Sequence, residues 1–525
     1  MDRGALLSAP RAAVATALLL LIPFLWKPFH IDDAFWLAVA ARIAEFPLAP
    51  YDFAFNWSGT PLPIWRTNLH PPLHGYGLAA IRGLFGSGEF AAHAALLPRA
   101  LFAAFCAGTV AKRLSKNPAL AALLATAAPA FVLGATNAMH DLTHYAFWMG
   151  AIAAGVEAAH ADGKRAQGWA AAAGFCVAGA ALSTYLGLAL IPLLAVYWRA
   201  KRGRWSAQTL WLLLPLAAVA LWGIYSLRHA GFFHPFAAGG YAAKPELQLA
   251  PKLPVAAAFL GGVLIWPVFC LPLLAWTPRK ASGTAAAAFA GLWLWIGAGG
   301  LWAVLAAGGL AALTLAALGA RDAGDDFPEV LLAVLWLGGV LVYAVGLNWS
   351  INARSLLPAG LPLAVLVLRW TDSLGFERRR SAMTVLTAGA AAAAVFSLWL
   401  GAADQGIARA QRAAAQREGG AGVRFIGHWG FQYYMERAGA AAYDYAKPKL
   451  ATGDRVVVSV NNSGSAPLPV PVSRVSLTPV PNPWGVATMS PVEGKAGFYS
   501  SLYGVTPFAL GPGQLYDVIV VERKD

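Results

Sequence analysis

Four short polar segments carry side chains that could do chemistry in a chain that is otherwise strongly apolar. Two adjacent carboxylates, Asp32 and Asp33, come directly after the first apolar run. Ionised groups beside hydrocarbon are costly to keep, so this placement favours a functional role for the pair. The alternative interpretation is an ordinary loop in which Asp33 caps a helix.

Three later segments add basic and acidic groups. Arg354 could hold a phosphate through its planar fork of donors, or simply extend to the membrane interface. The other two segments are Asn68-Leu69-His70-Pro71-Pro72-Leu73-His74-Gly75-Tyr76 and Asn137-Ala138-Met139-His140-Asp141-Leu142-Thr143-His144. The alternatives here are a proline-led helix start with incidental histidines, and a helix-capping role for Asp141.

The elements that position these residues must be membrane helices. Of the 525 residues, 58% are hydrophobic and only 12% are charged, whereas soluble domains carry about 25% charged residues. The net charge of +14 comes from short clusters between apolar runs and not from one basic face, which argues against nucleic acid as a partner. Membrane lipids are the expected surroundings. The three cysteines form no CxxC pair and indicate neither a disulfide framework nor a zinc site.

About thirteen segments are long and apolar enough to be membrane helices. They lie near 12–28, 95–112, 118–136, 141–159, 167–183, 184–198, 207–227, 253–276, 284–300, 301–319, 327–347, 355–370 and 382–401. Clusters of Lys and Arg then fall on alternate loops, at 112–116, 164–165, 199–204, 279–280 and 378–380. By the positive-inside rule, the N-terminus is cytoplasmic and all four polar segments lie together on the outer side.

The predicted fold class is therefore an α-helical polytopic membrane protein with a small C-terminal soluble α/β domain. Residues 1–401 form the membrane domain, and its first run is read as an uncleaved span. Within it, residues 29–94 make an outer loop with interfacial helices at 33–46 and 72–86. Residues 402–525 form the outer domain, with strands predicted at 455–460 and 516–521.

The order of these motifs resembles the GT-C glycosyltransferases, in particular the protein O-mannosyltransferase and aminoarabinose transferase family (glycosyltransferase 39, PMT-like). The matching elements are Asp32-Asp33, His70-Pro71-Pro72-Leu73, Asp141 and Arg354-Ser355-Leu356-Leu357-Pro358, spread over roughly residues 10–400. The family usually has Glu in the place of Asp33, and aminoarabinose transferases often have Lys in the place of His70.

The resemblance implies roles for these residues. Asp32 would be the general base, with Asp33 beside it, and Asp141 would orient the acceptor or a metal. Arg354, with His70, would bind the phosphate of a polyprenyl-phosphate-linked sugar. The acceptor would be a lipid, a protein or a glycan. We also expect His74, His140 and Tyr76 to contact substrate.

No nucleotide is suggested, because neither a phosphate-binding loop nor a dinucleotide fingerprint occurs. The spacing of four between His70 and His74, and between His140 and His144, leaves a divalent metal open without fixing a ligand set. No cofactor is otherwise predicted.

Two other functions remain open from the sequence. One is a transporter or flippase of lipid-linked sugars, and the other is a non-catalytic envelope assembly protein. The high Ala and Gly content suggests a bacterial inner membrane, with the C-terminal domain in the periplasm. The sequence specifies neither the sugar nor the prenyl chain length.

Overall fold

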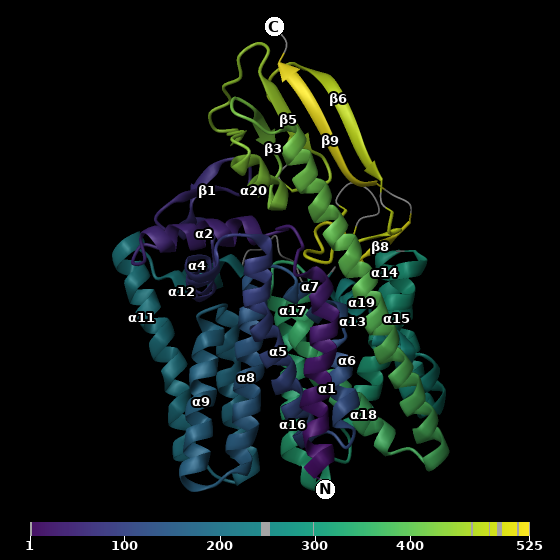
Figure 1. The fold of residues 1–525 in the computed structure, drawn as a ribbon. Helices are drawn as coiled ribbons and strands as arrows, with labels where there is room; N and C mark the ends of the chain where they lie inside the picture. The colour runs from purple at the N-terminus through teal and green to yellow at the C-terminus, as the bar shows by residue number, and fades with distance from the viewer. Residues whose placement is uncertain are drawn as a thin grey trace.

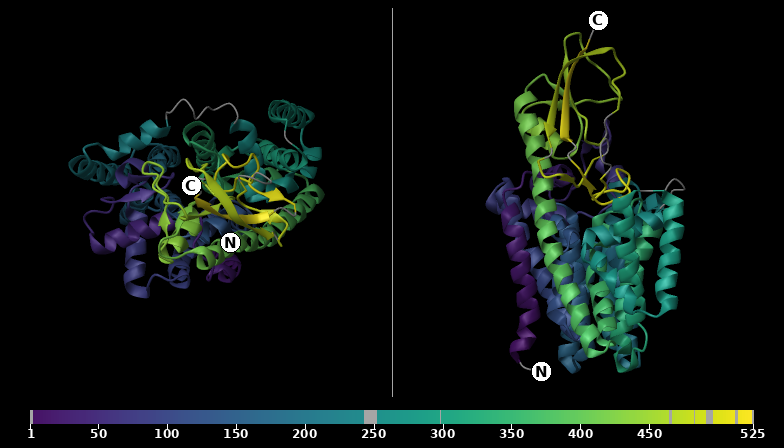
Figure 2. Two further views of the ribbon diagram at one scale, coloured as in Figure 1. Left: turned by 90° about the horizontal axis from the view of Figure 1, so that it is seen from above. Right: turned by 90° about the vertical axis from the view of Figure 1, so that its right-hand side faces the viewer.

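The computed structural model describes residues 3–242, 252–297, 299–463, 466–481, 483–490, 496–511 and 514–523. A bundle of long helices carries a smaller layer of strands at one end, and the N-terminal helix begins at the opposite end (Figures 1 and 2). The bundle helices are α1 (Arg3–Leu21), α5 (Glu89–Leu114), α6 (Pro118–Thr126), α7 (Pro129–Ala135), α8 (His140–His160), α9 (Gly163–Ala181), α10 (Leu190–Arg202), α11 (Leu213–Ala230), α13 (Lys252–Leu264), α14 (Arg279–Ile296), α15 (Gly300–Gly319), α16 (Phe327–Val342), α17 (Ala353–Leu356), α18 (Gly360–Asp372) and α19 (Phe376–Glu418).

Each predicted membrane segment contains helix in the structure. Within the described residues, six helical runs are long and apolar enough to cross a membrane, and two bent pairs, α6 with α7 and α13 with the turns that follow it, raise the number to eight. The chain therefore has the helices of a multi-pass membrane protein, while a count of thirteen crossings stays a prediction. The apolar residues 284–319 are divided between α14 and α15, and α14 ends at Gly297, which has φ +60°.

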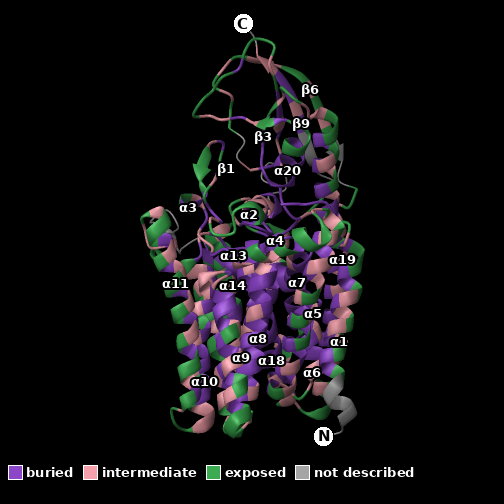
Figure 3. Cartoon of the chain, turned by 60° about the vertical axis from the view of Figure 1, so that its left-hand side comes forward, coloured by how far each residue is buried: buried purple, intermediate pink, exposed green. Residues whose placement is uncertain are grey.

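The centre of the bundle is buried (Figure 3), and many large apolar side chains are exposed on its surface. Leu294 and Leu221 are 78% and 68% exposed, as expected for side chains that face lipid rather than water. Inside, glycines allow close helix contact: a Cβ at Gly309 of α15 would collide with the carbonyl oxygen of Ala257 in α13. Such small-residue contacts are a common way to pack membrane helices, since lipid leaves no hydrophobic gain between them.

Short elements cover the end of the bundle that carries the strands. The two predicted interfacial helices are confirmed as helices α2 (Asp33–Glu45) and α4 (Leu73–Phe85), and they pack through Gly75 against Val39 and Ile43. A small hairpin of β1 (Ala54–Asn56) and β2 (Pro61–Pro63), then α3 (Ile64–Thr67) and α12 (His234–Ala242), complete this layer.

The C-terminal segment forms a five-stranded mixed sheet with the order β4-β3-β5-β9-β6. Its strands are β3 (Arg424–Ile426), β4 (Ala441–Ala442), β5 (Arg455–Ser459), β6 (Val472–Pro481) and β9 (Gln514–Arg523), so both predicted strands are confirmed. The helix α20 (Trp429–Arg437) connects the parallel strands β3 and β4. A second pair, β7 (Val486–Ala487) with β8 (Ala509–Leu510), lies nearer the bundle.

The predicted domain boundary at residues 401 and 402 falls inside a continuous helix. The 43-residue α19 leaves the bundle and runs up beside the sheet (Figure 1). Aromatic and aliphatic residues of the C-terminal segment, including Phe498 and Phe508, belong to the same buried core as the helices. The two parts therefore share one core, and the composition change near residue 402 does not coincide with a structural break.

We predict that Gly309→Ala destabilises the protein, because the added methyl group meets backbone that cannot move aside. Overpacking of this kind costs about 1–3 kcal/mol. Thermal unfolding in detergent should show a clear loss in melting temperature. Gly338→Ala in α16 is the matched control, since an added Cβ there meets nothing within 4 Å. Equal melting temperatures for the two variants would contradict the close α13–α15 contact.

Candidate active site

Three charged residues from distant parts of the sequence meet at the end of the bundle that carries the sheet. Nη1 of Arg354, in α17, lies 3.0 Å from Oδ2 of Asp32 and 3.6 Å from Oδ2 of Asp141. Asp32 immediately precedes α2, and Asp141 lies in the first turn of α8. The expectation that these carboxylates and this guanidinium lie on one side of the membrane is met.

The cluster is shielded but not sealed. The side chains of Asp32, Asp141 and Arg354 are 19%, 16% and 16% exposed. A substrate atom can therefore reach them, while most surrounding water is excluded. Charges act more strongly on a substrate in such a setting than in open water.

A strained turn presents Asp32. Ile31 has φ +46°, a left-handed conformation that is unusual for a β-branched residue, and its side chain is buried. Strain of this kind persists where the surrounding structure enforces it, and it is common at functional sites. Asp33, which follows Asp32, is fully buried and accepts a hydrogen bond from the His30 amide at 2.8 Å. Asp33 therefore closes the turn from behind, which favours a positioning role for it.

Burial raises the pKa of Asp32 above its ordinary value of 3.8, and the neighbouring carboxylate of Asp141 raises it further. Arg354 acts in the opposite direction, because its positive charge favours the ionised carboxylate. A carboxylate with a raised pKa is a better proton acceptor than an ordinary aspartate, provided that it is ionised at the working pH.

Two histidines line the same corner. The rings of His70 and His140 lie 4.0 Å apart between centroids, and His140 Nε2 is 3.8 Å from Asp141. Burial, with His140 beside it, lowers the pKa of His70 well below 6.5, so His70 is neutral near pH 7. Nδ1 of each ring is buried and makes no hydrogen bond within the described residues. Both atoms can accept or donate a bond to a polar ligand.

The other two predicted substrate contacts point elsewhere. The ring nitrogens of His74 are 2.8 Å from Thr143 Oγ1 and 2.9 Å from the Ala138 carbonyl oxygen, which ties α4 to α8. Tyr76 is 38% exposed and donates to the Pro47 carbonyl oxygen at 2.6 Å. In this arrangement both residues bind protein groups and not the Asp32 cluster.

The spacing of four between the histidines does not produce a metal site among the described residues. The helix α4 begins at Leu73, so His70 precedes it and does not share a helix face with His74. His144 instead approaches the Ala180 carbonyl oxygen at 3.1 Å. Among the described residues, no group of three or more His, Cys, Asp or Glu side chains could hold a metal ion. Asp141 also does not cap its helix, because Met139 occupies the N-cap position.

The C-terminal segment reaches the site, a contact that was not predicted from the sequence. Its Phe498 carbonyl accepts from the Ala353 amide at 2.9 Å, and the Tyr499 carbonyl accepts from Arg354 Nη2 at 3.4 Å. The Ser501 amide donates to the Ile351 carbonyl at 2.8 Å. This loop therefore fixes the backbone and the side chain of the residue that pairs with both carboxylates.

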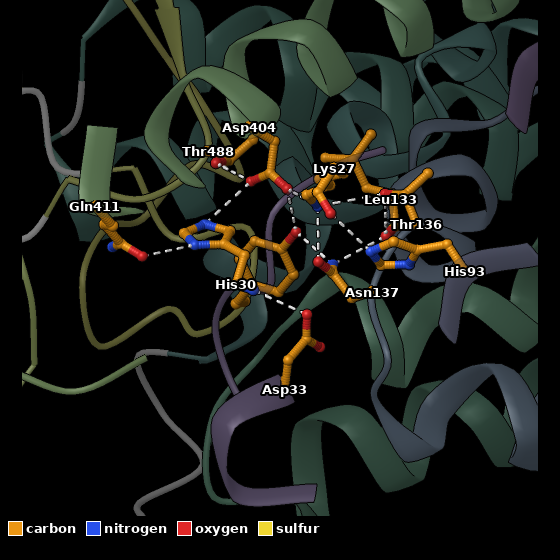
Figure 4. Close-up of polar contacts among 11 residues, drawn as sticks. Lys27, His30, Asp33, His93, Leu133, Thr136, Asn137, Asp404, Gln411 and Thr488 are labelled. Atoms are coloured by element: carbon orange, nitrogen blue, oxygen red, sulfur yellow. Dashed lines mark hydrogen bonds and ion pairs between the residues drawn. The ribbon is translucent and has the colours of Figure 1, made fainter. Parts of the chain in front are cut away.

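A second charged cluster, which Figure 4 shows around Lys27 and Asp404, was also not predicted. Lys27 Nζ is 2.6 Å from Oδ2 of Asp404 in α19 and 2.7 Å from Oδ1 of Asn137. Both charges are fully buried, so their removal from water is offset only by this dense set of partners. Asp404 also accepts from Thr488 Oγ1 at 2.6 Å and from the Tyr499 hydroxyl at 2.8 Å.

The contacts of the second cluster indicate a structural role. His30 Nε2 lies 3.6 Å from Asp404, but burial lowers the pKa of His30 to about 4, so the imidazole is neutral. The cluster joins the segments that follow α1 and α7 to α19 and the C-terminal segment, and Tyr499 belongs to both clusters. The signal in the sequence was present: a lysine ends the first apolar run, and an aspartate follows the last one.

Comparison with known proteins agrees with this fold. The oligosaccharyltransferase of Archaeoglobus fulgidus is 13% identical, with 84% of this chain and 64% of that chain covered and a TM-score of 0.51. ArnT from Cupriavidus metallidurans, solved bound to undecaprenyl phosphate, is 17% identical over 87% of this chain and 94% of its own, with a TM-score of 0.42. No curated protein sequence matches the chain.

The fold is that of the Archaeoglobus fulgidus oligosaccharyltransferase. Residues 69–226 match the model of the family described as dolichyl-phosphate-mannose-protein mannosyltransferase. The resemblance predicted from the motif order is thereby confirmed. The matched region contains His70 and Asp141 but neither Asp32 nor Arg354, which the three-dimensional structure adds.

We predict that Lys27→Met strongly destabilises the protein, because it leaves Asp404 buried without its cation. Breaking a buried pair in this way costs about 3–5 kcal/mol. The double variant Lys27→Met/Asp404→Asn should recover much of that loss, as measured by thermal unfolding in detergent. If the double variant unfolds at a temperature expected from the sum of the two single losses, the pair is not energetically coupled.

Proposed function

We propose that this chain is an inverting glycosyltransferase that moves a sugar from a polyprenyl-phosphate donor to a hydroxyl or amine acceptor. The observation that carries the proposal is the contact of Arg354 with both Asp32 and Asp141 in a shielded but reachable cluster. The family match supports a lipid-linked sugar as the donor. The acceptor is a lipid, a protein or a glycan.

The chemistry follows from the cluster. Asp32 accepts the proton of the acceptor as its oxygen or nitrogen attacks the anomeric carbon of the sugar. The bond between that carbon and the phosphate oxygen breaks, and its electron pair leaves with the polyprenyl phosphate. One displacement of this kind inverts the configuration at the anomeric carbon. Asp141, which contacts the same Nη1 of Arg354, orients the acceptor.

Arg354 has two tasks in this scheme. Its Nη1 holds both carboxylates, and a guanidinium carries further N–H donors that can bind the departing phosphate. Stabilising charge that develops on a leaving group is worth most where water is excluded. His70, neutral near pH 7, contributes a hydrogen bond to the donor through Nδ1 and not a positive charge.

The proposed setting is a bacterial inner membrane with the N-terminus in the cytoplasm and the C-terminal segment in the periplasm. The alternation of basic clusters supports this orientation. Asp32, Asp141 and Arg354 share the end of the bundle that carries the C-terminal sheet, so transfer takes place on the periplasmic side.

We predict that Asp32→Asn lowers the turnover of sugar transfer by at least about 100-fold, because the proton acceptor is lost. Binding of the donor lipid should persist. The assay supplies a polyprenyl-phosphate sugar extracted from the host membrane and measures both product and bound donor. Glu45→Gln is the matched control, since it removes one negative charge at an exposed position at the end of α2, the helix that Asp32 immediately precedes. An unchanged turnover in Asp32→Asn would exclude Asp32 as the proton acceptor, whereas the absence of any transfer by the unmodified chain would favour a transporter or an assembly protein.

The pH dependence of transfer tests the same residue. Since the pKa of Asp32 is raised, kcat/KM should fall as the pH is lowered through a value above 3.8. Asp141→Asn removes a charge that raises this pKa, so the acid limb of its residual activity should move to lower pH. A limb that stays in place or moves upward would separate the measured ionisation from Asp32.

A further inference from the structure

A cavity of about 790 Å³ lies at the end of the bundle that carries the N-terminus. It is enclosed by the last turns of α5, α15 and α18, the first turn of α16 and the segment before α14. The helix α5 begins at Glu89, at the end that carries the sheet, and ends at Leu114, which lines this cavity. Its 26 residues span about 39 Å. The cavity is therefore separate from the Asp32 cluster by the thickness of the bundle.

The cavity has more cations than it can pair. Its basic residues are Lys112, Arg113, Lys116, Arg321 and Arg369, and its acidic residues are Asp322, Asp326, Glu329 and Asp372. Three of the acids are already taken: Asp326 by Arg369 at 2.6 Å, Glu329 by Lys201 at 2.6 Å, and Asp372 by Arg379 at 2.8 Å.

Arg113 is also committed, since its guanidinium makes two bonds of 2.9 Å to Glu157 outside the cavity. Lys112, Lys116 and Arg321 make no ion pair within 4.0 Å among the described residues. Among the described residues that line the cavity, Asp322 is the one carboxylate without an ion pair, so three free cations face a single free anion. The cavity thus keeps an excess of positive charge that pairing inside the protein does not remove.

Orientation of helices alone does not explain this arrangement. The positive-inside rule needs basic residues in the loops, but it does not need them around one cavity. The loops on the same side hold Lys164, Arg165 and Arg204, which are exposed and lie outside the cavity lining. Those residues satisfy the rule without building a site.

The remaining lining is apolar and specifies the kind of ligand. Trp276, Leu318, Val365 and Leu366 form a hydrophobic wall beside the free cations. An anion with an attached hydrocarbon chain satisfies both surfaces, whereas a free phosphate would leave the wall against water. Basic pockets between membrane helices are suited to lipid headgroups for the same reason.

We infer that this cavity binds the phosphate headgroup of an anionic membrane phospholipid through Lys112, Lys116 and Arg321. The site lies on the side of the membrane opposite to the proposed sugar transfer, and it does not depend on that transfer. Its occupant sits among the ends of α5, α15, α16 and α18, so it stabilises the packing of these helices.

The test uses the full chain in a neutral detergent, titrated with dioctanoyl phosphatidylglycerol and, in a parallel arm, with inorganic phosphate. The variant Lys112→Gln/Lys116→Gln/Arg321→Gln should bind the phospholipid about 100-fold more weakly, roughly fivefold for each cation removed. The matched control Lys164→Gln/Arg165→Gln/Arg204→Gln removes the same charge on the same side and should stay within about twofold of the unmodified chain.

Equal weakening in the two triple variants would overturn the site in favour of general electrostatic attraction. Inorganic phosphate that binds as tightly as the phospholipid would overturn the assignment to a lipid. If the triple variant does not fold, Arg321→Gln alone should give the fivefold loss. A photoreactive phosphatidylglycerol should also label the unmodified chain at the peptides that contain Trp276 and Leu318, and labelling elsewhere would contradict the proposal.

Discussion

The constraint on which this structure depends is that one guanidinium serves two carboxylates that are far from it in the sequence. Arg354 follows Asp32 by more than three hundred residues, yet the two side chains are 3.0 Å apart. Without the arginine, Asp32 and Asp141 would repel each other in a partly dehydrated corner, and Asp32 would tend to take up a proton. The turn at Ile31, the start of α8 and the short α17 all serve to keep this contact in place.

The C-terminal segment completes the arrangement. Tyr499 accepts from Arg354 through its backbone carbonyl and donates to Asp404 through its hydroxyl, so a single residue joins the reactive cluster to the buried one. Burying Lys27 and Asp404 would be unfavourable without Asn137, Thr488 and Tyr499 as partners. Folding of this segment is therefore coupled to the integrity of the site, although its sheet lies farther away.

The sequence was sufficient for those features that depend on local composition. Apolar length predicted the helical segments, Pro71-Pro72 predicted the start of α4, and alternation predicted β5 and β9. The topology predicted from the basic clusters placed Asp32, Asp141 and Arg354 on one side of the membrane. Contacts that depend on tertiary packing could not be predicted: Lys27 looked like the end of a span, and Tyr499 lies in a loop without a periodic pattern. His74 and Tyr76 belong to the right segment, but helix orientation directs them to protein partners.

The uninterrupted α19 has a mechanical consequence. At 1.5 Å per residue, its 43 residues extend over about 65 Å, roughly twice the thickness of a bilayer's hydrocarbon core. A rigid rod of that length transmits tilt from one end to the other. Any partner that pushes on the strands would thus act as a lever on Asp404, about two-thirds of the way along the rod, and through it on the neighbouring charges.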